Sequence, residues 1–112
     1  MTTSTLTQTQ NLINVLNAKF ATLVNDHKDF STDQKKFIIL AAKLKVGDIT
    51  NYIQVIIRDK AKFFVDSTTG DILRVARFNS PLLGTLGNVS DLNCADLFTV
   101  NRIGVFLTDS VL

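Results

Sequence analysis

The first part of the chain carries apolar residues at the spacing of an α-helix. Between residues 9 and 26 they recur one, three and four positions apart, which places them along one stripe of a helix. The stripe consists of Leu12, Ile13, Leu16, Phe20, Leu23 and Val24. Polar residues such as Asn11, Asn14 and Lys19 fall largely outside it. The pattern predicts a first helix over residues 9–26 with one buried face.

A second helix is indicated by the signals at its two ends. Ser31 and Gln34 have the spacing of a capping box, and Gly47 follows two lysines as a stop signal. These signals predict a helix over residues 32–45. The apolar run at residues 37–40 leaves a buried strand as the alternative, because periodicity alone cannot assign a short run rich in isoleucine.

After this helix the composition changes to residues that favour strands. Residues 49–57 and 61–65 are rich in Ile, Val and Phe, with a polar break between them, and residues 72–78 continue the pattern. The intervening turn offers an Asp that bonds its own backbone and a Gly that tolerates positive φ. We expect this turn to be structural, formed by Asp66, Thr69, Gly70 and Asp71. Two helices on a three-stranded antiparallel meander predict an α+β fold.

The last third of the chain is expected to be rich in loops. One proline and two glycines predict a loop over residues 79–89, followed by a short helix over residues 90–98. Residues 102–107 are expected to form a last strand or an extended tail. With 112 residues, of which 46% are hydrophobic, the chain has the size of one domain with its own core. We expect a single α+β domain over residues 1–112, with a helical part (1–47), a β-meander (48–78) and a loop-rich part (79–112).

The composition lacks the parts of most catalytic and metal sites. The chain has one cysteine, Cys94, one histidine, His27, and no glutamate. A disulfide scaffold and a zinc site of Cys and His within one chain are therefore excluded. His27 lies in a polar stretch between the helices and is expected at the surface, and Cys94 is expected to be a small buried hydrophobe. We expect no catalytic residue, no metal, no cofactor and no enzymatic activity.

The charges and the apolar residues indicate two kinds of binding. Five basic residues of the meander alternate with aromatic residues, as in some single-strand nucleic-acid binders, with Phe64 or Phe78 stacking on bases. They are Arg58, Lys60, Lys62, Arg74 and Arg77. However, the net charge is only +2, and pairing Val65 with Ile72 would leave apolar residues on both faces of the sheet. We therefore favour a protein interface, whose candidate residues are Leu82, Leu83, Leu86, Phe106 and Leu107.

A set of residues in the middle of the chain has a characteristic order and spacing. These residues are Phe64, Val65, Asp66, Thr69, Gly70, Asp71, Ile72, Arg74, Ala76, Phe78, Pro81, Gly87, Asn88 and Val89. In this order and spacing the chain resembles a family of small bacteriophage-encoded proteins of uncharacterised function. The family pattern reads Phe-Val-Asp, two variable residues, Thr-Gly-Asp-Ile or Val, then a basic residue, Ala, an aromatic, Pro and Gly-Asn with an aliphatic residue. The family usually carries basic residues in the loop where this chain has Leu82, Leu83 and Leu86.

The resemblance implies a viral origin and a shared α+β fold, but no activity. We expect a viral protein that acts through protein contacts, as a homo-oligomer or as a minor structural or assembly component that binds another viral protein. Single-stranded nucleic-acid binding is the alternative. Because the start of the chain is polar and no run of about 20 apolar residues is present, we expect no signal peptide and no membrane insertion. Host cytoplasm or virion is the expected location.

Overall fold

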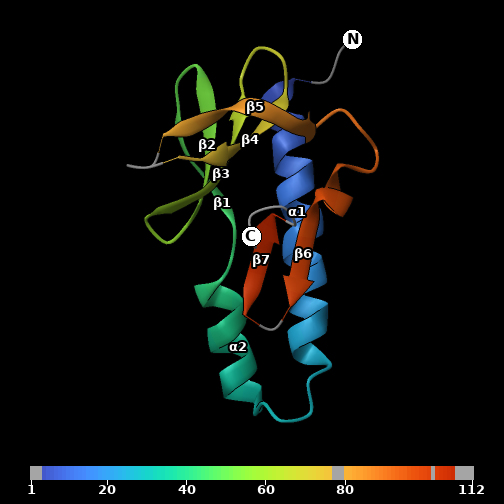
Figure 1. Cartoon of the computed structure of the whole chain (residues 1–112). Coiled ribbons are helices and arrows are strands. Elements are labelled where there is room, and N and C mark those ends of the chain that lie inside the picture. Colours follow the sequence, from blue (N-terminus) through green and yellow to red (C-terminus); the bar gives the residue numbers. More distant parts are fainter. Residues whose placement is uncertain (1–3, 77–79, 102, 108–112) are drawn as a thin grey trace.

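Two helices, a five-stranded antiparallel sheet and a small two-stranded sheet make up the structure (Figure 1). The computed structural model describes residues 4–76, 80–101 and 103–107. The elements in chain order are α1 (Thr5–Asn25), α2 (Thr32–Ala41), β1 (Lys45–Ile49), β2 (Tyr52–Ile57), β3 (Lys60–Asp66), β4 (Asp71–Val75), β5 (Pro81–Asn88), the 3-10 helix η2 (Cys94–Leu97), β6 (Phe98–Asn101) and β7 (Gly104–Leu107). The predicted α+β class is confirmed, but the predicted three-stranded meander is wrong, because the sheet has five strands.

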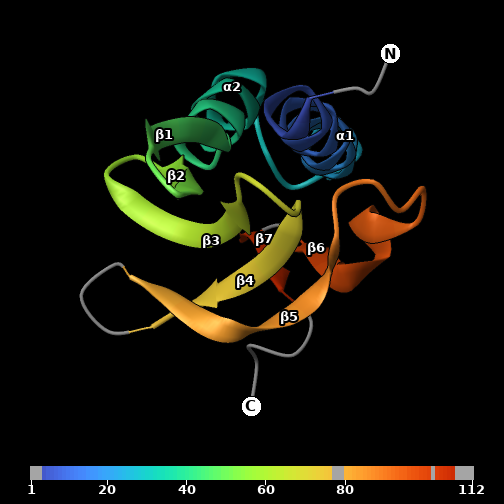
Figure 2. The ribbon, with the colours of Figure 1, turned by 90° about the horizontal axis from the view of Figure 1, so that it is seen from above.

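The five strands follow one another in space in the order β1-β2-β3-β4-β5, and each pair is antiparallel. Seen from above, the sheet curls from β1 beside α2 to β5 on the far side (Figure 2). Both helices lie on the same side of it, and the β6–β7 pair lies on its concave side together with α1. The second sheet therefore closes a space that the two helices leave open.

The core forms where the stripe of α1 meets this concave face. Every predicted stripe residue except Leu23 is buried, and Thr9 joins them. Their partners on the sheets are Ile53, Val55, Phe63, Val65, Ile72, Phe98, Val105 and Leu107. The predicted pairing of Val65 with Ile72 is confirmed. Burial of these side chains stabilises the fold by roughly 25 cal/mol for each Å² of apolar surface removed from water.

The second helix is confirmed, but it ends four residues earlier than predicted. Its capping box is present: the Ser31 hydroxyl accepts from the Gln34 amide at 3.2 Å, and the Gln34 side chain accepts from the Ser31 amide at 2.8 Å. The chain leaves the helix because the Asn17 side chain on α1 binds both backbone groups of Leu44, at 2.9 and 3.0 Å. Residues 45–49 are thereby free to pair with β2 as strand β1.

The predicted loop over residues 79–89 is wrong, because most of it forms strand β5. Proline is tolerated at the first position of an edge strand, where its missing N–H costs no ladder bond. Between the pairs Ile72–Gly87 and Arg74–Leu82 the ladder shifts register, so that residues 83–86 of β5 correspond to a single residue of β4. The predicted helix over residues 90–98 shrinks to η2, and Phe98 begins β6, which pairs with β7.

Candidate functional site: a cleft between α2 and two hairpin turns

A cleft of about 720 Å³ opens where α2 faces the β2–β3 turn and the start of β7. Three segments that are far apart in the sequence supply its walls. Its apolar walls include Phe37, Ile57, Ile103 and Phe106. Its charged residues are Arg58, Asp59, Lys60 and Lys62, all from one hairpin. The cleft therefore combines apolar walls with three cations and one carboxylate.

Two large apolar side chains on the cleft stand mostly in solvent. Phe37 of α2 is 67% exposed, and Ile103, just before β7, is 74% exposed. The core-facing side of α2 is provided instead by Ile38 and Ile39, which pack against the core. Single exposed apolar residues are common, but two that line one concavity are typical of a contact surface.

Lys62 reaches the cleft because of a β-bulge. The β2–β3 register pairs Val55 with Phe63 but Ile56 with Ala61, which leaves Lys62 as an extra residue on β3. A bulge turns a side chain away from its regular alternation. Lys62 accordingly lies on the core side, with its ammonium 4.2 Å from the centre of the Phe106 ring.

The surroundings of Lys62 withdraw its ammonium from water. Burial lowers the pKa of Lys62 from its ordinary value, and no carboxylate in the described part of the chain counteracts this effect. The Phe106 ring attracts the cation by about 0.5–2 kcal/mol at such sites. Lys62 is therefore a half-buried cation that lies against an aromatic face.

Arg58 holds an unusual backbone conformation at the rim. The turn between β2 and β3 has two residues, Arg58 and Asp59, and such short turns require positive φ. Arg58 has φ +56°, and among the described residues no other non-glycine residue has positive φ. Glycine or asparagine adopts this conformation at lower cost, so the turn itself does not explain an arginine.

The structure brings together three of the five basic residues predicted to contact nucleic acid. Arg58, Lys60 and Lys62 line the cleft. Arg74 lies on β4 opposite Leu82, in a different part of the sheet. Arg77 and the stacking candidate Phe78 fall outside the described residues. The other stacking candidate, Phe64, is 5% exposed and contacts the edge of Tyr52, so it offers no face to a base.

The predicted interface divides into two separate surfaces. Leu82 and Leu83 are exposed on β5, the last strand of the sheet, whereas Leu86 packs against the core. Phe106 lines the cleft. Leu107 is buried in the core, so it has no surface through which to make the contact predicted for it.

The turn between β3 and β4 is held by hydrogen bonds within the protein. The Asp66 carboxylate accepts from the amides of Thr68 and Thr69 at 2.8 and 3.1 Å, and Gly70 has φ +81°. The Asn88 amide group donates to the Thr69 carbonyl at 2.8 Å and to the Asp71 carboxylate at 3.0 Å. Motif residues from two parts of the chain thus fasten the turn to the end of β5.

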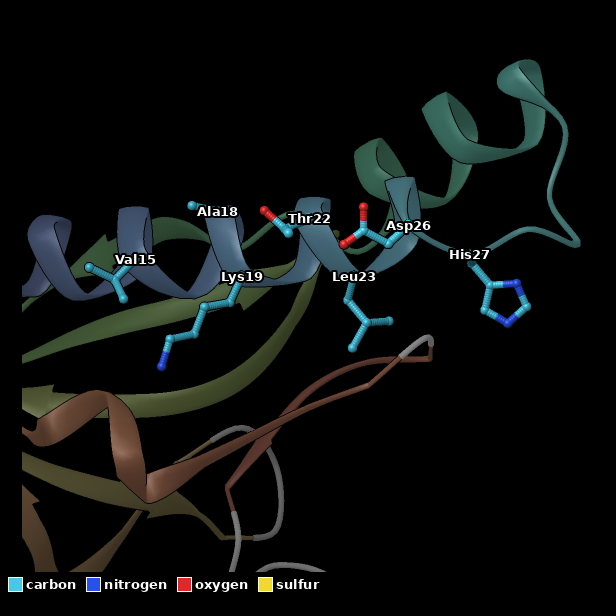
Figure 3. A pocket seen from close by; sticks show the side chains of 7 residues that line it. All are labelled: Val15, Ala18, Lys19, Thr22, Leu23, Asp26 and His27. Carbon is cyan, nitrogen blue, oxygen red and sulfur yellow. The ribbon is translucent and has the colours of Figure 1, made fainter.

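A second hollow, of about 740 Å³, lies on the outer side of α1 (Figure 3). Val15, Lys19, Leu23 and His27 project to one side of the helix, at the i, i+4 spacing of a solvent face. His27 accepts from the Asp29 amide at 3.3 Å and stacks on Phe30. Since the residues that line this hollow come from α1 and its end alone, it joins no distant parts of the chain.

The remaining chemical candidates form no reactive centre. Cys94 is buried, and burial, with a smaller effect of Asp91, raises the pKa of its thiol. Among residues 4–76, 80–101 and 103–107, no three His, Cys or acidic side chains gather closely enough to hold a metal ion. In the same part of the chain no helix has the length and apolar character needed to cross a membrane.

Of the apolar walls of the cleft, only Phe106 was predicted from the sequence, as an interface residue. Phe37 belongs to the apolar run at residues 37–40, and the observed helix, Thr32–Ala41, places it away from Ile38 and Ile39, which pack against the core. That helical offset is the signal that could have identified it. No local signal joins Phe37 to Ile103, because they lie more than 60 residues apart in the sequence and meet only in the folded chain.

The sequence matches no family model, and no curated protein or solved structure is significantly similar to it. The resemblance to small phage proteins therefore stays a prediction.

Proposed function

We propose that this is a non-enzymatic viral protein that works through contacts with other proteins, as a homo-oligomer or as a small component of a larger viral particle. One observation carries the proposal: exposed large apolar side chains stand in pairs at two places, Phe37 with Ile103 at the cleft and Leu82 with Leu83 on β5. The viral origin rests on the resemblance of residues 64–89 to phage-encoded proteins.

The β5 edge is the surface that we assign to self-association. Leu83 is 79% exposed, and the strand pairs on only one side within the described residues. An edge strand with apolar side chains is a ready template for pairing with another chain. α2, which supplies one wall of the cleft, lies at the end of the molecule opposite β5, so the cleft remains available for a different protein (Figures 1 and 2).

Light scattering over a range of protein concentrations tests this assignment. We expect a defined oligomer for the natural chain and a lower mass for Leu83→Ser. The matched control is Leu92→Ser, because Leu92 is 99% exposed and lies outside both surfaces, in the segment before η2. A monomer at every concentration contradicts the homo-oligomer, and an equal effect of the two substitutions indicates unspecific apolar association.

Single-stranded nucleic-acid binding is the second candidate, supported by the gathering of three cations on the β2–β3 hairpin. It predicts affinity for single-stranded DNA that falls steeply with salt, with a log–log slope of roughly −0.7 for each phosphate neutralised. Absence of binding at low salt removes this candidate.

A further inference from the structure

We propose that the cleft beside α2 binds an acidic segment of another protein, one in which a carboxylate stands next to a large apolar side chain. The inference rests on the proposed function, since it names the chemistry of the partner that the cleft would dock. It is carried by charge complementarity at one half-buried cation and by the two exposed apolar side chains on the walls.

The charge argument starts from Lys62. Its ammonium is already partly removed from water, so a carboxylate that approaches it recovers the electrostatic interaction without the full desolvation of a free lysine. Arg58 and Lys60 at the rim extend the positive potential, and Asp59 opposes only part of it. Such a potential attracts acidic ligands and disfavours basic ones.

The apolar argument determines what accompanies the carboxylate. Phe37 and Ile103 border the cleft with most of their surface in water, and covering them is favourable by the hydrophobic effect. A peptide side chain of Leu or Phe size fits a volume of about 720 Å³ together with its backbone.

A polypeptide agrees better with the cleft than a nucleic acid does. With Asp59 in the same turn as Arg58, the three cations of the cleft leave a net charge of only +2, which suits one or two carboxylates better than a chain of phosphates. The stacking candidate Phe64 is covered, and Lys62 lies over the Phe106 ring, so Phe37 is the one exposed aromatic side chain among the residues that line the cleft. Single-strand binders stack successive bases on several aromatic side chains, whereas a helix or strand ligand lays its apolar side chains into an apolar groove.

A random twelve-residue peptide library displayed on phage tests the proposal without assuming a partner. It is selected in parallel on the natural chain, on Lys62→Met and on Lys19→Met. The methionine keeps an apolar stem over Phe106 and removes the charge, and Lys19 on α1 provides the same substitution away from the cleft. We expect peptides that pair Asp or Glu with a large apolar residue from the natural chain and from Lys19→Met, and loss of the acidic preference with Lys62→Met.

The best peptide is then measured by fluorescence anisotropy beside a version with Asn and Gln in place of its acids. We expect the neutral version, or Lys62→Met, to weaken binding about tenfold, as for loss of a charge-assisted hydrogen bond. Amide shifts in NMR spectra should centre on Phe37, Lys62 and Ile103. Equal affinity of both peptides, shifts centred elsewhere, or selection without acidic preference overturns the proposal. If no peptide is selected but single-stranded DNA shifts the amide signals of the cleft residues, the cleft is assigned to nucleic acid, and this result overturns the proposal as well.

These outcomes are separable from those of the light-scattering test. An oligomer that Leu83→Ser dissociates, combined with no acidic selection, leaves the proposed function standing and removes the inference. A monomer that selects acidic peptides removes the homo-oligomer and keeps the inference. A monomer that selects none removes both.

Discussion

Arg58 occupies a backbone position that the turn alone would assign to glycine or asparagine. A non-glycine residue with left-handed φ costs about 1–2 kcal/mol, and such costs are concentrated at functional positions. The charge of Arg58 at the rim of the cleft supplies a reason for the arginine. Lys62 is a second position at which a cation occupies a place that another residue type would fill at lower cost, because an apolar side chain would pack there more easily.

The substitution Arg58→Asn is expected to stabilise the fold and weaken recognition. Asparagine adopts positive φ more readily, so the free energy of unfolding should rise by about 1 kcal/mol in urea titrations. Acidic-peptide affinity should fall at the same time. Lys60→Asn, in the same hairpin but with ordinary φ, is the control, and an equal gain in stability from it would contradict the strain at Arg58.

Cys94 is expected to be unreactive while the protein is folded. Its raised pKa keeps the thiol protonated, and burial excludes reagents, so labelling by Ellman's reagent at pH 8 should be at least about tenfold slower than in guanidinium. Because the folded state holds the proton more tightly than the unfolded chain, stability should fall as pH rises above the ordinary thiol range. Immediate labelling of the folded protein would contradict this prediction.

At the scale of elements, the features that depend on neighbouring residues in the sequence could be predicted, and those that depend on contacts between distant segments could not. The stripe of α1 and the cap of α2 lie within one helix each, and both were found. The end of α2 depends on Asn17, which is 27 residues away from Leu44, and β5 depends on its pairing with β4. For the cleft likewise, the cations share one hairpin and were identified together, and Phe106 was identified as an interface residue, whereas Phe37 on the distant α2 was missed.

The variant Asn17→Ala should remove the hydrogen bonds that join α1 to the backbone just before β1. It removes two hydrogen bonds and leaves both backbone groups of the buried Leu44 without their partner, at a cost of about 2 kcal/mol in the free energy of unfolding. The matched control is Asn11→Ala, an exposed position on the same helix, for which we expect a change within about 0.5 kcal/mol. Similar losses in both variants would show that the side-chain bonds contribute little.

At the scale of the whole molecule, β5 lies at one end and α2, which carries Phe37 of the cleft, lies at the other (Figures 1 and 2). No residue is shared between the two exposed surfaces. An assembly that grows along β5 would therefore present its clefts outward, and each copy would keep a site for a second protein.

This separation predicts independent effects of substitution. Leu83→Ser should change the mass in solution but not the affinity for a selected acidic peptide, and Phe37→Ser should do the reverse. The double variant should show both effects additively, because substitutions that share no contacts rarely couple. Light scattering and anisotropy on the four proteins check this, and peptide binding that alters the oligomer mass would show the surfaces to be coupled.

Because Lys62 is the extra residue of a β-bulge, it could be removed without changing the pairing of the two strands. Since Ala61 and Phe63 already face Ile56 and Val55 in turn, removal of the single codon for residue 62 would leave an uninterrupted ladder with every core side chain on its present face. Insertion of one lysine codon into such a regular hairpin would restore the cation. Recognition of an acidic partner could thus be lost or regained by a change in length rather than by the exchange of one side chain for another.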